Sequence, residues 1–363
     1  MSRFTRAALS AVAALAIAAM PAAAQDPHGR YTINHDYRPS ASLARVGWLS
    51  DYYPGLLGTP GDTKVYYFEG SRPGGTLFIA GGTHANEIAG VMAAVLILET
   101  VRVDAGRVIV VPNMNNSGAG HQDVEPGMPA YTTRGPSWIR LDTPSGTRFF
   151  KYGSRCTNLA HQGAPDPEGG YVHPDSREAP LPAWEARNLN RAYPGRTDAG
   201  LTQKIAYAVM RLLEAEKVDV AFDYHEADVG GRLANMMVAH PKNIALAAAA
   251  VMDVELDYGI PLKLEPSNLA FRGLSHREWG SGSGAFAFLT ESPNPAMSSD
   301  AEDSVDVVWN PAAPLASRVG LHVACTAAVI AEYNAAYPER AILVSGVPAY
   351  DELVERGVGA FLK

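Results

Sequence analysis

The stretch TLFIAGGTHANEIAGVMAAVLILETV, residues 76–101, decides the fold class of this chain. It opens with an apolar run that predicts a buried strand over 76–82, and it continues with helical apolar spacing over 86–101. His84 and Glu87 stand in the tight turn that enters this helix. A strand that leads directly into a helix predicts an α/β domain, and the turn places two metal-ligating side chains where the strand ends.

The same alternation continues along the rest of the chain. Apolar runs of strand type and segments with helical apolar spacing follow one another. We expect further strands at 64–70, 107–115, from 218 onward and 285–292, and further helices at 202–217, 243–259 and 314–337. The pattern predicts an α/β fold with a mixed, mainly parallel sheet and helices on both faces.

Residues 116–186 break this alternation. The segment carries many Gly and Pro residues and several aromatics, but it shows no clear period. A loop region of this length inside a compact domain is usually functional or partly structured. We therefore expect an insertion that covers part of a main domain spanning 25–340, with residues 341–363 as a C-terminal extension.

The first 24 residues differ from the rest of the chain. Arg3 and Arg6 precede the apolar stretch AALSAVAALAIAAM, and PAAAQ then offers a small-residue cleavage site. This order is typical of a secretory signal peptide, with an uncleaved N-terminal anchor as the alternative. We expect cleavage after Ala24, a periplasmic or secreted protein, and no membrane span in the mature chain.

Composition narrows the classes of partner. The chain of 363 residues has 30 Lys+Arg and 38 Asp+Glu, so removal of Arg3 and Arg6 leaves 28 against 38 and a net charge of −10. Basic clusters are absent from the sequence, which argues against nucleic acid and anionic lipid as partners. Cys156 and Cys325 are the two cysteines. In an oxidising compartment they form either one disulfide or two unpaired thiols, and the sequence leaves both open.

The strongest chemical signal is a set of four side chains at strand ends. His84 and Glu87 follow the strand at 76–82, His225 lies at the end of the strand that starts at 218, and Glu291 lies near the end of the strand at 285–292. Ligands of open α/β sheets bind beyond the carboxyl ends of the strands. Two imidazoles and one carboxylate leave a fourth position open, as in a catalytic zinc site.

A serine mechanism and a dinucleotide loop both fit poorly. GSGSG, residues 280–284, has Gly282 where a nucleophile elbow needs serine. The same glycines neither follow a predicted strand nor open a predicted helix, as a dinucleotide-binding loop would require. We interpret this segment as a flexible loop beside the strand of Glu291.

Four motifs in order resemble the zinc carboxypeptidase superfamily, and more narrowly its succinylglutamate desuccinylase/aspartoacylase branch. They are GGTHANE at 81–87, LNRAYPG at 189–195, DYHEA at 223–227 and LTES at 289–292. The resemblance covers about residues 76–292, and it explains neither 116–186 nor the last 25 residues. It implies the fold of the zinc carboxypeptidases.

Carried over position by position, the resemblance makes His84, Glu87 and His225 the ligands of one zinc ion. It makes Glu291 the general base, and it assigns Asn190 and Arg191 to the carboxylate of the substrate. Two departures stand out. The family has Asp where this chain has Asn188, and the arginine that polarises the scissile carbonyl has no fixed place. The candidates for that arginine are Arg155, Arg177 and Arg187.

The resemblance therefore implies that 25–340 is the catalytic domain of a secreted, zinc-dependent amide hydrolase. Its substrate would be a small N-acyl amino acid or a peptide with a free carboxylate. The alternatives are a carboxypeptidase that acts on cell-wall peptides, and a catalytically inactive binding module on the same fold. Glu291 argues against the binding module, since a protein that only binds needs no base.

Overall fold

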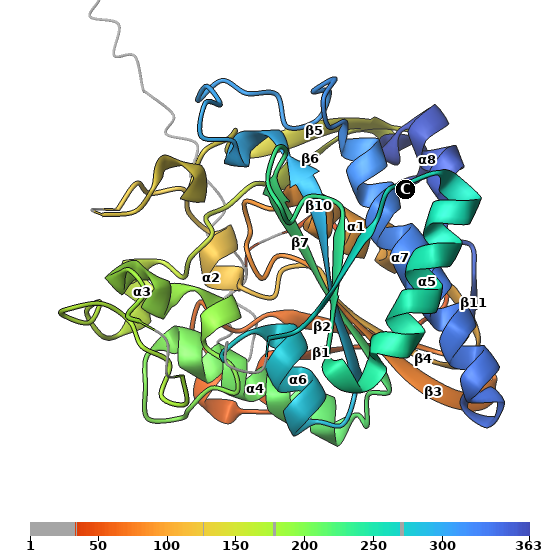
Figure 1. The fold of residues 1–363 in the computed structure, drawn as a ribbon, viewed down its shortest axis with the longest axis horizontal. Helices are drawn as coiled ribbons and strands as arrows, with labels where there is room; N and C mark the ends of the chain where they lie inside the picture. The colour runs from red at the N-terminus through yellow and green to blue at the C-terminus, as the bar shows by residue number, and fades with distance from the viewer. Residues whose placement is uncertain (1–32, 34, 126, 177–178, 269–271) are drawn as a thin grey trace, which may run out of the picture.

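The structure is a computed structural model, and it describes residues 33, 35–125, 127–176, 179–268 and 272–363. The predicted signal peptide, residues 1–24, lies outside the described residues. Figure 1 shows a twisted sheet that runs through the middle of the molecule, with helices packed on both sides.

The main sheet contains nine strands among the described residues. Eight follow one path in the order β1-β2-β4-β3-β7-β10-β8-β9, and β11 pairs separately with β4. In chain order the strands are β1 Leu43–Trp48, β2 Lys64–Glu69, β3 Arg72–Ala80, β4 Arg102–Val111, β7 Val220–Asp228, β8 Met236–Ala239, β9 Lys263–Pro266, β10 Phe286–Asn294 and β11 Leu343–Ser345.

The four central strands β4, β3, β7 and β10 are parallel to one another, whereas β2, β8 and β11 join this centre in antiparallel pairs. The central strands read as almost continuous apolar runs because helices cover both faces of the sheet. The predicted mixed sheet with helices on both faces is confirmed.

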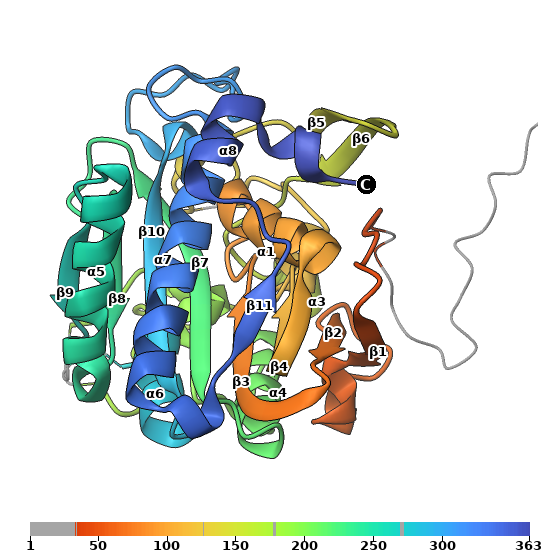
Figure 2. The same ribbon diagram turned by 90° about the vertical axis from the view of Figure 1, so that its right-hand side faces the viewer.

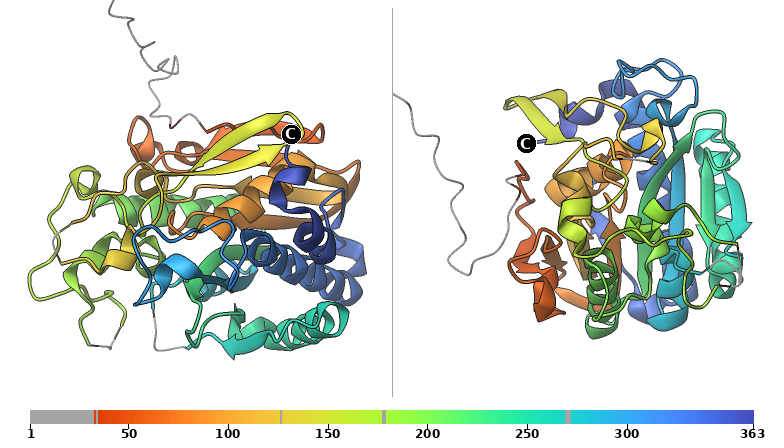
Figure 3. Two further views of the ribbon diagram at one scale, coloured as in Figure 1. Left: turned by 90° about the horizontal axis from the view of Figure 1, so that it is seen from above. Right: turned by 90° about the vertical axis from the view of Figure 1, so that its left-hand side faces the viewer.

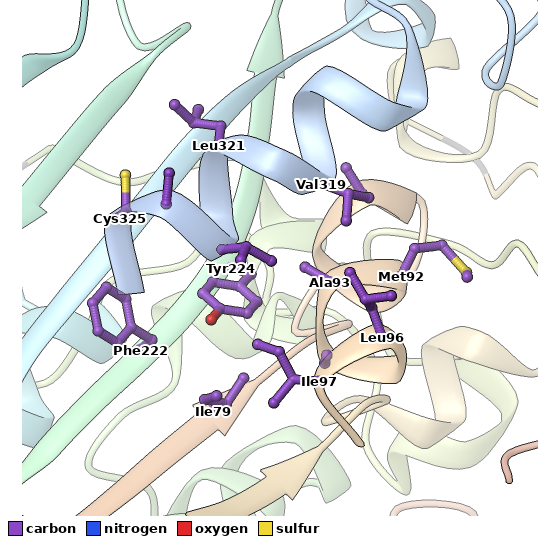
Figure 4. Packing of buried hydrophobic residues seen from close by; sticks show 14 of the residues in the cluster. Ile79, Met92, Ala93, Leu96, Ile97, Phe222, Tyr224, Val319, Leu321 and Cys325 are labelled. Carbon is purple, nitrogen blue, oxygen red and sulfur yellow. The ribbon is translucent and has the colours of Figure 1, made fainter. Parts of the chain in front are cut away.

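Helices α1, α5 and α7 share one apolar core with the sheet, and α4 and α6 share a second core with the opposite face. Their bounds are α1 Ile88–Thr100, α4 Leu201–Ala215, α5 Ile244–Tyr258, α6 Ser275–Gly282 and α7 Leu315–Ala336. Figure 2 shows α7 lying along the sheet beside α5. In Figure 4, Met92, Ala93, Leu96 and Ile97 of α1 lie among side chains of β3, β7 and α7.

Helix α1 lies between the sheet and α7, which explains its apolar surface all round: residues 88–99 are all buried. Gly90 is what lets the helix approach β7 so closely. A Cβ atom at this position would lie 2.5 Å from the carbonyl oxygen of Tyr224. The close approach places the start of α1, and the turn before it, against β7.

Helix α7 is long and apolar enough to cross a membrane by length and composition alone. However, 67% of its most apolar window is buried inside the fold. It behaves as a core helix of the domain.

The segment 116–186 contains several short elements. They are α2 Asn116–Ala119, the hairpin β5 Trp138–Thr143 and β6 Gly146–Lys151, α3 Leu159–Gln162, and 3-10 helices at Ala130–Thr132 and Ala183–Arg187. Its residues 153 and 154 exchange backbone hydrogen bonds with Ala85, in the turn that follows β3. The segment therefore supports the turn that carries His84 and Glu87.

Residues 341–363, which the sequence set apart as an extension, pack onto the main domain. They form β11, helix α8 (Tyr350–Arg356) and a final 3-10 helix, and Leu353, Val358 and Leu362 belong to the main apolar core. The β5–β6 hairpin lies beside the C-terminus (Figure 3), where Arg148 donates to the backbone oxygen of Lys363 at 3.0 Å.

Two local expectations are resolved by the structure. Cys156 and Cys325 are buried and unpaired, so of the two alternatives the structure has two free thiols. The interpretation of GSGSG as a loop is wrong for its first three residues, because Gly280 to Gly282 form the end of α6. Trp279, fully buried against Phe78 and Tyr193, stabilises this helix despite its Gly and Ser content.

Candidate metal centre

The structure brings His84, Glu87 and His225 together at the carboxyl edge of the sheet. One ligand atom from each lies within 4.8 Å of the others, and all three side chains are buried. His84 and Glu87 come from the turn between β3 and α1, with Glu87 directly before the first residue of the helix. His225 comes from β7, the neighbour of β3 in the sheet.

The donor atoms crowd a single point. His84 Nδ1 lies 2.7 Å from Glu87 Oε1, His225 Nδ1 lies 2.8 Å from Glu87 Oε2, and the two Nδ1 atoms are 3.1 Å apart. At most one proton can lie between two imidazole nitrogens at that distance. A cation bound by both nitrogen lone pairs and by the carboxylate would satisfy all three groups. Two imidazoles and one carboxylate are the donor set of a catalytic zinc site.

In both imidazole rings the second nitrogen, Nε2, faces an oxygen atom. His84 Nε2 lies 2.7 Å from Asn188 Oδ1, and His225 Nε2 lies 2.9 Å from Asp223 Oδ2. The oxygen at His84 Nε2 favours the tautomer whose proton is on Nε2, and this leaves Nδ1 of His84 bare for a metal. Asp223 places its charge beside His225 Nε2, although these two atoms do not meet in hydrogen-bond geometry. Asn188 thus takes the position of an acceptor although it carries no charge.

The charges of the site also call for a cation. Burial lowers the pKa of His84 to about 4, so this ring is neutral, as a metal ligand must be. Burial disfavours the charged form of His225, but the carboxylates of Asp223 and Glu87 outweigh it and raise its pKa well above its usual range. The two buried carboxylates therefore attract positive charge, and a divalent ion held by the donor group would supply it.

Glu291 lies next to this group on β10, where it is in register with His225 of β7. Burial raises the pKa of Glu291 to about 8. Its Oε2 atom is buried and has no hydrogen-bond partner among the described residues. The carboxyl group is thus placed beside the donor group without being fixed by another side chain at that oxygen.

Asn190 and Arg191 line the same cavity as the donor group and Glu291. They belong to a short 3-10 helix, Leu189–Arg191. The backbone nitrogen of Ser275, the first residue of α6, donates to Asn190 Oδ1 at 2.8 Å, which orients the amide. Arg191 NH1 donates to the backbone oxygen of Asn190 at 2.7 Å. Burial lowers the pKa of Arg191.

Of the three arginines that the sequence left open, Arg155 lies at the site. Its NH1 donates to Glu87 Oε1 at 2.8 Å, and it lines the cavity. Arg187 is turned away and is bound by Glu125 and Asp166. Arg177 lies outside the described residues.

The cavity has a volume of about 530 Å³, which is ordinary for a small-molecule site. Besides the donor group and Glu291, its lining includes apolar side chains and the charged pair Arg232 and Glu265. The apolar side chains are those of Leu233, Val238, Leu274, Leu289 and Met297.

Two site residues, Asp223 and His276, were missed by the sequence reading. Asp223 stands two positions before His225, and the two-residue period of a strand would have predicted that it shares the face of His225. Arg155 was one of three candidates, and the sequence could not choose among them because the 116–186 segment shows no period. His276 of α6 lines the cavity, but its helix was not expected.

No family model matches the chain, and no curated protein matches it. Similar solved structures include a succinylglutamate desuccinylase from a Silicibacter species, with 17% identity and a TM-score of 0.43 over 88% of this chain and 74% of that chain. A succinylglutamate desuccinylase/aspartoacylase from Rhodobacter sphaeroides has 16% identity and a TM-score of 0.45, over 86% and 69%. The tripeptide-bound cell shape determinant Csd4 from Helicobacter pylori has 12% identity and a TM-score of 0.48, over 81% and 60%. The first two of these structures carry the name of the family that the four sequence motifs resemble.

Proposed function

We propose that this chain is a zinc-dependent amide hydrolase that cleaves a small N-acyl amino acid or a peptide with a free carboxylate. The observation that carries the proposal is one cavity that contains a buried His-Glu-His donor group, an unfixed carboxyl group and two basic side chains. Each component has a separate part in hydrolysis, and a binding protein would need no carboxyl group like that of Glu291.

His84, Glu87 and His225 would hold the ion. When bound, zinc lowers the pKa of a water molecule and polarises a carbonyl group. Glu291 accepts a proton from the attacking water and returns it to the nitrogen that leaves. A pKa near neutral suits both transfers, because the same group must take up the proton and release it.

Arg155 and Arg191 divide the anionic groups of the substrate between them. Arg155, beside Glu87, stabilises the negative charge that develops on the carbonyl oxygen. Arg191 and Asn190 hold the carboxylate of the substrate, because a guanidinium group can contact both of its oxygens. This contact fixes the amide bond relative to the donor group, so it contributes to rate as well as affinity.

The size of the cavity also favours a second candidate, a carboxypeptidase for cell-wall peptides. Arg232 and Glu265 line the same cavity, and its volume of about 530 Å³ leaves room for more than one residue of a peptide. A panel of N-acyl amino acids and short peptides of equal concentration would separate the two candidates by their kcat/KM values.

The test of the carboxylate anchor is a matched pair of substrates, one acid and its amide, measured on the native enzyme and on Arg191→Ala. We expect the native enzyme to prefer the acid strongly and Arg191→Ala to lose most of that preference by a lower kcat/KM for the acid alone. Arg191→Lys should restore little, since a point charge cannot reproduce the two-pronged contact. An acid-to-amide ratio unchanged in Arg191→Ala would place the anchor elsewhere.

We also propose that the chain is exported, on the basis of residues 1–24 of its sequence. Expression in a bacterial host and N-terminal sequencing of the periplasmic fraction should give Gln25 as the first residue. Full-length protein confined to the cytoplasm would contradict export.

A further inference from the structure

Glu185 is a buried carboxylate that belongs to neither the donor group nor the anchor, yet it contacts the residues that serve both. It lies in the 3-10 helix Ala183–Arg187 and is 7% exposed. Its Oε2 atom accepts a hydrogen bond from Asn188 Nδ2 at 2.6 Å and lies 3.6 Å from Arg191 Nε.

Asn188 passes this contact on to the donor group. Its Oδ1 atom lies 2.7 Å from His84 Nε2 and also accepts the backbone N–H of Asn190 at 2.9 Å. A continuous chain therefore runs from His84 through Asn188 to Glu185 and on to Arg191. The negative charge that Asn188 itself lacks stands one residue further from His84, on Glu185.

This arrangement has two physical consequences. The bond from Asn188 Nδ2 to Glu185 fixes which end of the Asn188 amide faces His84, so an oxygen acceptor always meets His84 Nε2. The charge of Glu185 also polarises the amide and raises the basicity of the imidazole, as acceptors behind metal-bound histidines do. On its other side, the same carboxylate attracts the guanidinium group of Arg191 and limits its orientations.

We propose that Glu185 is a positioning residue with two arms, one that orients His84 for the metal and one that orients Arg191 for the carboxylate of the substrate. The Arg191 arm rests on the proposed function. The His84 arm does not, because it concerns metal affinity in the absence of substrate.

The first variant is Glu185→Gln, which keeps the shape of the side chain and removes its charge. We expect its zinc affinity to fall about 10-fold, at the lower end of the range for residues behind metal ligands. Competition with a chromogenic chelator, without substrate, measures this directly. Glu216→Gln is the matched control, since Glu216 is also ion-paired, with Arg107, but lies outside the cavity. An unchanged zinc affinity in Glu185→Gln would overturn the His84 arm.

Asn188→Asp supplies a sharper test because it moves the charge to His84. In the native background, the carboxylate introduced by Asn188→Asp would face Glu185 as a like charge, so this single variant should also bind zinc more weakly. In the double variant Glu185→Gln/Asn188→Asp, the amide of the new glutamine can donate to the new carboxylate. We expect the double variant to regain the zinc affinity that each single variant loses.

A merely structural role of Glu185 would produce additive losses instead, and additive losses would overturn the proposal. If Glu185→Gln does not fold, the comparison of Asn188→Asp with the double variant still decides. Tighter zinc binding by the double variant than by Asn188→Asp supports the His84 arm, and equal or weaker binding refutes it.

The Arg191 arm is tested by measuring KM for a carboxylate substrate and for its amide. Glu185→Gln should raise KM for a carboxylate substrate more than for its amide, and the double variant should recover zinc affinity without recovering that KM. Equal KM changes for acid and amide would refute this arm alone. If no carboxylate substrate is cleaved even by the native enzyme, the proposed function and this arm fail together, while the zinc measurements still decide the His84 arm.

Discussion

Strands β7 and β10 present polar side chains to both faces of the sheet, and the two faces use them differently. On the α6 side, His225 and Glu291 border the cavity, with two imidazole nitrogens 3.1 Å apart and a carboxylate oxygen that lacks a partner among the described residues. On the opposite side, Glu226 and Ser292 meet Arg318 and His322 of α7.

The polar groups of the α7 side bind one another. Both ring nitrogens of His322 face hydroxyl groups, Thr290 at 2.7 Å and Ser292 at 3.2 Å. Glu226 accepts from Arg318 at 2.5 Å and from the backbone nitrogen of Ala89, near the start of α1, at 2.9 Å. Burial of histidine and glutamate therefore does not by itself make a site. On the α6 side, by contrast, two imidazole nitrogens converge on one carboxylate, and Glu291 Oε2 has no hydrogen-bond partner among the described residues.

The largest expected effect is loss of the proposed zinc ion on the α6 side. His225→Ala removes one of the three proposed ligands, so the purified protein should retain no zinc after dialysis while it keeps its far-ultraviolet circular dichroism. His322→Ala is the matched control on the α7 side and should retain one equivalent. Metal analysis of both variants decides, and a full equivalent of zinc in His225→Ala would reject the assignment.

The next effect is on stability and belongs to the α7 side. Arg318→Met leaves Glu226 buried without its cationic partner, and the loss of one member of a buried pair costs about 3–5 kcal/mol. Urea unfolding of the metal-free protein measures the change. The double variant Arg318→Met/Glu226→Gln removes the unpaired charge and should recover part of the loss. No recovery would mean that the cost lies in packing and not in charge.

The third effect is on turnover and returns to the α6 side. Glu291→Gln preserves shape but cannot accept a proton, so kcat should fall by about 10²-fold or more. Zinc content and the midpoint of unfolding should change little, which separates this variant from the two above. Turnover at a rate near that of the native enzyme would show that another group takes the proton.

The contrast between the two faces also shows how far the sequence alone reaches. The apolar runs of β3, β4, β7 and β10 predicted the centre of the sheet, and strand-end positions predicted that His84, Glu87 and His225 would meet. Local pattern is enough for these residues because His84 and Glu87 follow β3, His225 lies near the end of the neighbouring strand β7, and parallel strands end at one edge.

Other features depend on contacts between distant segments. Helix α6 has weak intrinsic propensity, and it forms because Trp279 packs into the core. Strand β8 has only four residues, too few to show a period. Arg155 reaches the donor group because residues 153 and 154 pair with the backbone of Ala85, and no local pattern predicts that pairing. The sequence likewise did not predict the polar network on the α7 side, since His322 and Arg318 look like ordinary positions of a long helix.

The smallest expected effect tests whether the α7 network is electrically neutral at His322. Burial lowers the pKa of His322 to about 3, compared with an ordinary value of 6.5. Between these two values the unfolded chain binds a proton at this position and the folded chain does not. Stability must therefore fall as the pH drops below about 6.5, with a slope that approaches about 1.4 kcal/mol per pH unit for one group.

His322→Gln removes this titration while an amide can still meet one of the two hydroxyl groups. The variant should be less stable than the native protein at pH 7, and the difference between them should shrink as the pH falls from 6.5 towards 4. Other buried histidines, such as His84 and His276, titrate in both proteins and cancel from the difference. Urea unfolding at several pH values, on metal-free samples of both proteins, measures it. A difference that stays constant with pH would show that His322 gains its proton before the fold is lost, and the α7 side would then be a titrating network and not a closed one.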